Sequence, residues 1–452
     1  MLRTRFWVGP LVAVAAAAPV VAIPAARQLL ETRVARADGG MGSQDSPSLL
    51  SRLESRAPAP PSLAGADLTK ITADESGATL ALPEKRVAKL WVDPQLQRTA
   101  ESLMTLHHLP ESAIVMMDVQ TGHILAYASH VEKGPARDLC VEATAPAASV
   151  FKIVTGAALV EVANVSPDVK ECYSGGEQRI MPSDLEPDAH RDKWCTTLSG
   201  AMGRSINTVF ARLAQRNLKP NQLEEFAKGF GFGSALPFDV PVQASALQMP
   251  HEPLAFARTA AGFWNTTLSP LHAATLSATV ARGGEIPRAQ LVAEVLSSSG
   301  SSMYTAREAH PVRRAMKAET AQAVTTMMDQ TVAEGTSYRA FHDAKGKSFL
   351  PNIQVAGKTG TLTDAQTQRY YTWFTGFAPS HPQPNQRQVA IAVLVVNQAV
   401  WHVKANTVAR EMLRAYFAGQ KAQGVTAPTL RASTTREASA SAIAVAPATK
   451  AR

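Results

Sequence analysis

The stretch Ala147-Ala148-Ser149-Val150-Phe151-Lys152 organises this chain, and the apolar run of residues 153–160 follows it directly. Ser149 stands three residues ahead of Lys152, and side chains at this spacing share one face of a helix. The serine hydroxyl and the lysine amine can therefore meet. Burial or a second cation would lower the pKa of the amine, so that it could take the serine proton near neutral pH. A helix that begins near Ser149 would also present free backbone N–H groups to a developing anion.

A Ser-x-x-Lys pair alone is weak evidence, because it occurs by chance in many helices that have one polar face. Two further elements stand downstream in the chain. The first is Ser205-Ile206-Asn207, inside a helical region of residues 198–218, and the second is Gly357-Lys358-Thr359-Gly360-Thr361 in an edge strand. Three such elements in this order make chance a poor explanation.

In this set of motifs the chain resembles the penicillin-binding transpeptidase family. The resemblance extends from about Ser112 to about Arg414, and its flanking matches are residues 122–129, 268–274, 281–284 and 373–379. It implies an α+β fold, in which helices and an all-helical subdomain flank a five-stranded antiparallel sheet. The strand order of that sheet comes from the resemblance and not from the periodicity of the sequence.

The resemblance also implies serine acyl-enzyme chemistry. Ser149 would be the nucleophile, and Lys152 would be the base of the acylation step, although the identity of that base is disputed across the superfamily. Ser205 would pass a proton to the leaving amine. Asn207 would hydrogen-bond an amide of the substrate and help to fix Lys152.

The third motif would hold the substrate. Lys358 would attract the terminal carboxylate of the substrate, and Thr359 and Thr361 would hydrogen-bond that carboxylate. Gly360 lacks a side chain, which allows the strand backbone to approach a ligand closely. By resemblance, the oxyanion site would use the backbone N–H groups of Ser149 and Thr361.

The amino-terminal residues predict export from the cytoplasm. Arg3 and Arg5 precede residues 7–26, which carry no charge. This is the pattern of a secretory n-region and h-region, and about twenty residues can span a bilayer. We favour an uncleaved signal anchor within residues 1–37, with the catalytic domain outside the inner membrane. The alternative is a cleaved signal peptide.

The composition of the remaining chain predicts three parts. Residues 38–90 are rich in Gly, Ser, Pro and Ala and are interpreted as a flexible linker. Residues 91–418 are interpreted as the transpeptidase domain. Residues 419–452 consist mainly of Ala, Ser, Thr and Pro without periodicity, which is typical of a disordered tail.

Charge and cysteine content limit the function classes. The net charge of +8 is not gathered in a basic stripe with interleaved aromatic residues, which argues against nucleic-acid binding. The spacing of Cys140, Cys172 and Cys195 is not that of a zinc site, and no pattern implies a metal or organic cofactor. Related transpeptidases often carry cysteines near Cys172 and Cys195, which could form a disulfide. Three buried thiols are the alternative.

The leading hypothesis is a D,D-transpeptidase that cross-links peptidoglycan stem peptides, binds β-lactam antibiotics and works beside a peptidoglycan glycosyltransferase. A D,D-carboxypeptidase or a serine β-lactamase would use the same acyl-enzyme with water as the acceptor. Glu224 and Glu225 fall in a helical stretch rather than in a loop, which makes a deacylating role for either unfavourable. A non-catalytic cell-wall scaffold or a β-lactam sensor is the third hypothesis.

Overall fold

The structure is a computed structural model that describes residues 63–422, apart from residues 64, 177–178, 365, 399–400 and 402. The interpretations of residues 1–37 as a signal segment and of residues 423–452 as a tail lie outside this range. Residues 419–422, which the composition assigns to the tail, instead form the end of helix α13 (Ala405–Ala422). Within the described residues, no helix is both long enough and apolar enough to cross a bilayer.

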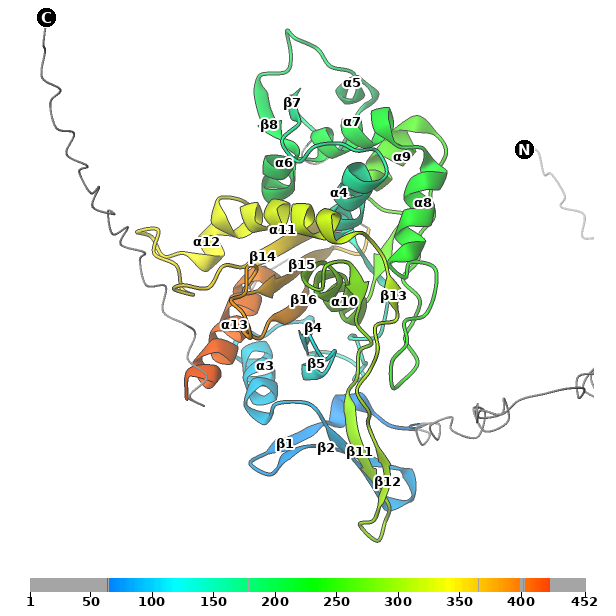
Figure 1. Ribbon diagram of the computed structural model, residues 1–452, viewed down its shortest axis with the longest axis vertical. Helices are drawn as coiled ribbons and strands as arrows, with labels where there is room; N and C mark the ends of the chain where they lie inside the picture. Colours follow the sequence, from blue (N-terminus) through cyan, green and yellow to red (C-terminus); the bar gives the residue numbers. More distant parts are fainter. Residues whose placement is uncertain are drawn as a thin grey trace, which may run out of the picture. The chain divides into compact units, whose positions relative to one another are not determined.

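A five-stranded antiparallel sheet forms the centre of the described residues, with the strand order β14-β15-β16-β4-β5 (Figure 1). Its strands are β4 (Glu111–Asp118), β5 (Ile124–Val131), β14 (Ala356–Asp364), β15 (Arg369–Ala378) and β16 (Val389–Asn397). Every residue of β16 is buried, because helices cover both faces of this central strand. The predicted five-stranded antiparallel sheet is confirmed, and the strand with the third motif, β14, lies at its edge.

The two faces of the sheet belong to two hydrophobic clusters. One face, which includes Phe374 and Ile391, packs against α3 (Pro94–Leu106) and α13 (Ala405–Ala422). The other face, which includes Trp373, packs in the same cluster as the helices around the nucleophile motif. Since neighbouring residues of a strand point to opposite faces, Trp373 and Phe374 serve different layers.

The helices of the second layer surround the three motifs (Figure 1). They comprise η3 (Ala148–Phe151), α4 (Lys152–Glu161), α5 (Pro182–Leu185), α6 (Leu198–Arg204), α7 (Asn207–Asn217), α8 (Pro220–Gly229), α9 (Pro253–Ala260), α10 (Pro270–Ala281) and α11 (Ala318–Ala333). The short helix α12 (Tyr338–Phe341) instead packs Phe341 into the cluster of α3 and α13. Short strand pairs lie between them, formed by β6 (Ala145–Pro146) with β9 (Thr267–Leu268), β7 (Lys170–Tyr173) with β8 (Trp194–Thr197), and β10 (Glu285–Ile286) with β13 (Arg313–Arg314).

A second five-stranded sheet corrects the interpretation of residues 38–90 as a linker. Its order is β1-β2-β3-β11-β12, with β1 (Thr72–Asp74), β2 (Gly77–Leu82), β3 (Arg86–Leu90), β11 (Val292–Leu296) and β12 (Ser302–Thr305). The flexible-linker prediction is therefore wrong for residues 72–90. Leu80 and Leu82 are buried, and β3 pairs with β11, which lies about 200 residues further along the chain.

Candidate active site

The nucleophile motif forms the start of a buried helix. Ser149 lies in η3, and Lys152 begins α4 with its side chain completely buried. Lys152 Nζ donates to Ser149 Oγ at 2.8 Å, to Asn207 Oδ1 at 2.6 Å and to the Ala261 carbonyl oxygen at 2.5 Å. Three acceptors surround the amine, and this fixes its position beside the serine hydroxyl.

The backbone ahead of Ser149 has an unusual conformation. Ala148 has a φ of +49°, which is uncommon for a residue with a side chain. Gly262, at the end of α9, packs so closely against this residue that an added Cβ would lie 2.4 Å from the Ala148 carbonyl oxygen. The turn that presents the nucleophile is thus held from outside by a glycine contact.

The second motif occupies the junction of α6 and α7. Ser205 has a φ of +60° and ends α6, so the region of residues 198–218 forms two helices rather than one. Asn207 begins α7, and its Nδ2 donates to the Gly176 carbonyl oxygen at 3.1 Å. This bond orients the amide, so that Asn207 Oδ1 faces Lys152.

The third motif brings the edge strand of the sheet to the same place. Lys358 is completely buried, and its Nζ donates to Ser205 Oγ at 2.9 Å and to the Thr359 carbonyl oxygen at 2.8 Å. Thr359 Oγ1 lies 2.6 Å from Thr336 Oγ1, whereas Thr361 is exposed. Two hydroxyl groups therefore stand along the strand beside the cation.

Gly360 allows β14 to lie against the nucleophile motif. A Cβ at this position would lie 3.3 Å from Ala148 Cβ and 3.2 Å from Trp373 Cβ, which is tighter than ordinary contact. Trp373 in turn donates its Nε1 hydrogen to the Pro146 carbonyl oxygen at 3.0 Å. The edge of the sheet and the nucleophile turn are thus joined directly.

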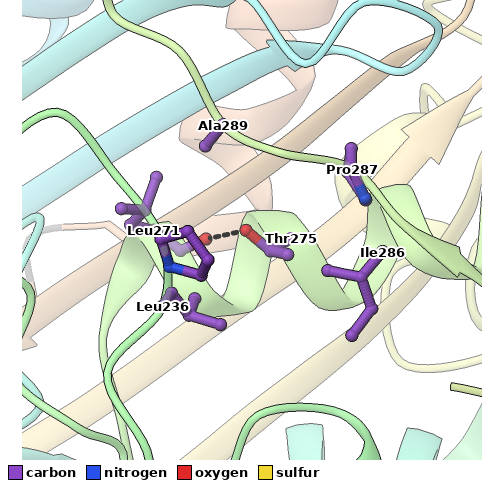
Figure 2. Close-up of a pocket in the computed structure, with 7 residues that line it drawn as sticks. Leu236, Leu271, Thr275, Ile286, Pro287 and Ala289 are labelled. Atoms are coloured by element: carbon purple, nitrogen blue, oxygen red, sulfur yellow. Dashed lines mark hydrogen bonds between the residues drawn. The ribbon is translucent and has the colours of Figure 1, made fainter. Parts of the chain in front are cut away.

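An apolar pocket beside α10 is separate from these groups. Figure 2 shows it, with Thr275 Oγ1 donating to the Leu271 carbonyl oxygen at 2.8 Å. Its lining residues are Leu236, Pro237, Leu271, Thr275, Ile286, Pro287 and Ala289. None of them belongs to the three motifs, so this pocket is not the candidate active site.

Comparison with known families decides the identity. The penicillin binding protein transpeptidase domain matches residues 112–417. The chain belongs to the penicillin-binding protein transpeptidase family. The matched range of residues 112–417 agrees with the limits near Ser112 and Arg414 that the motifs and their flanking residues predicted.

The relatives of this family member include enzymes of cell-wall synthesis. Peptidoglycan D,D-transpeptidase PbpA of Mycobacterium tuberculosis is 28% identical over 275 residues, which are 59% of this chain and 52% of the relative. Stage V sporulation protein D of Bacillus subtilis is 25% identical over 317 residues, which are 65% of this chain and 47% of the relative. The chain spans about half the length of these curated relatives.

Solved structures share the fold. The D,D-transpeptidase domain of a peptidoglycan glycosyltransferase from Eggerthella lenta has a TM-score of 0.60 and 24% identity, and the match covers 75% of this chain and 84% of that one. The imipenem acyl-enzyme complex of penicillin-binding protein A from M. tuberculosis has a TM-score of 0.59 and 23% identity, and the match covers 73% and 79% of the two chains.

Burial changes the proton affinity of both lysines in the candidate active site. Burial, with a smaller effect from the charge of Lys358, holds the pKa of Lys152 well below its usual range. Burial also lowers the pKa of Lys358 to about 7. Burial therefore favours the neutral amine at Lys152, while Lys358 changes its charge near pH 7.

A disulfide closes the polar loop between the first two motifs. Cys172 and Cys195 are bonded across β7 and β8, and Cys140 is a buried free thiol. Within the described residues, no group of three or more His, Cys, Asp or Glu side chains is arranged to hold a metal ion.

The structure places all of the predicted motif residues along one junction, but it adds groups that the sequence did not indicate. The carbonyl groups of Ala261 and Gly176 complete the surroundings of Lys152 and Asn207. A backbone carbonyl can belong to any residue type, so no sequence signal could have identified them. Arg212, in the buried part of α7, did have a sequence signal. A charged residue among apolar helix residues indicates that buried partners must compensate its charge.

Proposed function

We propose that this protein is a serine D,D-transpeptidase that cross-links peptidoglycan stem peptides. The observation that carries the proposal is the buried Lys152 amine, whose Nζ lies 2.8 Å from Ser149 Oγ. Burial and the charge of Lys358 lower the pKa of this amine, and no carboxylate is among the groups that shift it. A neutral amine in this position can act as the base for a serine nucleophile.

In the proposed acylation step, Ser149 Oγ attacks the carbonyl carbon of the penultimate D-alanine while Lys152 takes the hydroxyl proton. The C–O bond to Ser149 forms, and the amide bond to the terminal D-alanine breaks. The leaving amine receives its proton through Ser205, whose hydroxyl accepts a hydrogen bond from Lys358. In the second step, the amine of another stem peptide attacks the acyl carbon and a new amide bond forms. The C–O bond to Ser149 breaks, and a proton of the amine passes through Lys152 to Ser149 Oγ, which regenerates the hydroxyl.

The strand β14 would hold the donor peptide during this reaction. Lys358 supplies positive charge, and Thr359 and Thr361 supply hydroxyl groups for the terminal carboxylate. The backbone N–H groups of Ser149 and Thr361 would bind the oxyanion, and the loss of one such donor typically costs about 3–4 kcal/mol of transition-state stabilisation. The same groups would bind β-lactams, as an acyl-enzyme structure of a family neighbour supports.

The cellular setting follows from the same proposal. The segment of residues 1–37 would anchor the protein in the inner membrane or direct its export, with the catalytic domain on the extracytoplasmic side. A peptidoglycan glycosyltransferase would supply the glycan strands whose peptides are joined. The chemistry requires no metal or organic cofactor and no nucleic acid.

A hydrolytic role has weaker support. Glu224 and Glu225 both pair with Lys228 on α8, at distances of 3.1 Å and 2.9 Å. These carboxylates therefore pair with a lysine on the surface of α8, and this position does not support either of them as the base that would activate a deacylating water.

The experiment that tests the proposal follows a pentapeptide ending in D-Ala-D-Ala, incubated with the full-length protein and an amine acceptor, by mass spectrometry. We expect release of D-alanine together with the transfer product, and loss of both in a folded Ser149→Ala variant. Hydrolysis without transfer would favour a carboxypeptidase, and rapid turnover of benzylpenicillin would favour a β-lactamase. No reaction and no covalent adduct would favour a scaffold.

A further inference from the structure

Arg212 of α7 is a completely buried cation outside the three motifs. All five of its N–H groups are used. They donate to the carbonyl oxygens of Asp184 at 2.6 Å, Cys172 at 2.7 Å and Glu186 at 3.0 Å, and to the two carboxylate oxygens of Asp192 at 2.7 and 3.2 Å. The planar guanidinium satisfies five acceptors from a fixed geometry, which a lysine amine cannot do.

Every one of these partners lies in the connection between the first and second motifs. The disulfide between Cys172 and Cys195 closes this connection at its base. Three backbone carbonyls of this segment, those of Cys172, Asp184 and Glu186, accept hydrogen bonds from the one guanidinium, which satisfies polar groups of a segment with little regular secondary structure. Arg212 therefore holds residues 172–176 and 179–192 against α7.

The held segment contacts the active site through two glycines. The carbonyl oxygen of Gly175 accepts from Thr208 Oγ1 at 2.9 Å, and that of Gly176 accepts from Asn207 Nδ2 at 3.1 Å. Both glycines have positive φ, and a Cβ on Gly176 would lie 1.9 Å from Thr208 Oγ1. The segment thus lies directly on the amino-terminal turn of α7.

The bond from Asn207 to Gly176 sets the direction of the amide. While Asn207 Nδ2 donates to this carbonyl, Asn207 Oδ1 on the other side of the amide faces Lys152. Oδ1 accepts a hydrogen bond from Lys152 Nζ at 2.6 Å. An amide without this anchor could turn its NH₂ group toward the amine, where it would occupy the nitrogen lone pair that must accept the Ser149 proton. A displacement of the segment would therefore disturb the base of the reaction.

We infer that Arg212 is a positioning residue for acyl transfer: by holding the disulfide-closed segment, it keeps the Gly176 carbonyl on Asn207 and thereby keeps Lys152 aimed at Ser149. This inference rests on the proposed function and identifies the support of its catalytic base. The alternative is that Arg212 contributes to stability alone.

The test measures acylation of the full-length protein by benzylpenicillin, and separates the rate constant at saturation from the affinity. Arg212→Met should lower the rate constant at saturation by about tenfold to a hundredfold, as expected for a misplaced catalytic group. Arg212→Lys keeps the charge but not the planar fork, and should lose about threefold to tenfold. Circular dichroism and thermal unfolding check that each variant is folded.

Arg216→Met is the matched control on the same helix. Arg216 pairs with Glu171 and bonds to the Arg212 carbonyl, but its described contacts do not include the glycines or residues 179–192. Its removal deletes one cation and one ion pair, and the acylation rate should stay within about twofold of the wild type.

A double-mutant cycle with Asn207→Ala distinguishes positioning from stability. If Arg212 acts through Asn207, then Arg212→Met should change the rate by less than about twofold once the amide is absent. The rate–pH profile of Arg212→Met should also move its acidic limb upward, because water admitted to Lys152 would raise the pKa of that amine. Lys358 on β14 is the charged group that lowers this pKa in the intact site.

Wild-type rates and an unchanged pH profile in folded Arg212→Met, or in Arg212→Lys where the first variant does not fold, would overturn the inference. Full additivity with Asn207→Ala would also overturn it. If the wild-type protein forms no adduct, the proposed function is overturned, and the inference depends on that function. This result is seen in the wild type alone, before any variant is compared.

Discussion

The two sides of the active site are built in opposite ways. The helical wall, which we define as Ser149, Lys152, Asn207 and the Ala261 carbonyl, surrounds the Lys152 amine with three acceptors at 2.5–2.8 Å. The strand wall, defined as Lys358, Thr359 and Thr361, lies on the edge of a sheet, and its last hydroxyl is exposed. The difference indicates a division of labour, in which the closed wall moves protons and the open wall binds a partner.

The electrostatics of the two lysines follow the same division. Burial lowers the pKa of Lys152 well below its usual range and lowers that of Lys358 to about 7. The low pKa favours the neutral amine that a base needs at Lys152, whereas Lys358 carries the charge that attracts a carboxylate below about pH 7. Each prediction below changes one wall and leaves the other intact.

The largest effect is expected from Lys152→Met in the helical wall. The substitution removes the base, and general-base catalysis contributes about a thousandfold in rate. The rate of adduct formation with benzylpenicillin should fall by that order, while its affinity changes little. A folded variant that acylates within about tenfold of the wild type would remove Lys152 from the role of base.

Asn207→Asp should have the next largest effect, and it should depend on pH. A carboxylate beside Lys152 favours the charged amine and raises its pKa, so less of the neutral base is present at pH 7. We expect the acylation rate at pH 7 to fall by about tenfold to a hundredfold and to recover as the pH rises. A loss that is equal at every pH between 6 and 9 would contradict this electrostatic account.

The strand wall predicts a dependence of affinity on pH. Lys358 is charged below its pKa of about 7 and loses its charge as the pH rises through that value. The second-order acylation constant should therefore fall above pH 7, by up to about tenfold per pH unit, while the rate at saturation is less affected. In Lys358→Met the alkaline limb should disappear, and its persistence would assign that limb to another group.

The smallest effect is expected from Thr361→Val. The exposed hydroxyl contributes one hydrogen bond to a substrate carboxylate, so its loss should weaken binding about fivefold to tenfold. The rate at saturation should not change. Thr363→Val, two residues further along the same strand and equally exposed, is the matched control. Equal effects of the two substitutions would show that the position of Thr361 is not special.

The sequence predicted the active site better than the outer parts of the fold. The motif residues carry their own chemistry, and the spacing of Ser149 and Lys152 already placed their side chains on one face. The edge position of β14 was also predicted. The division of the helical region at Ser205 was not, because a left-handed residue other than glycine has no reliable local signal.

The second sheet shows why the rest could not be predicted. Strand β2 is rich in small residues and Pro83 follows it directly, which are features of linkers. The order of the sheet depends on pairing of β3 with β11, whose register joins Ala88 with Val295. Pairing over such a distance leaves no periodic trace in either segment. The position of Arg212 indicates that it needs buried partners, but the sequence does not show which backbone carbonyls it bonds, because they lie far away along the chain.

The central claim is that Ser149 becomes acylated beside a neutral Lys152. The most direct measurement is intact-mass spectrometry of the full-length protein with benzylpenicillin over time, followed by peptide mapping, for the wild type and Ser149→Ala. The account predicts one lasting penicilloyl group on the peptide that carries Ser149, and none on the variant. Equal labelling of the two proteins, or an adduct that maps to another residue, would contradict it.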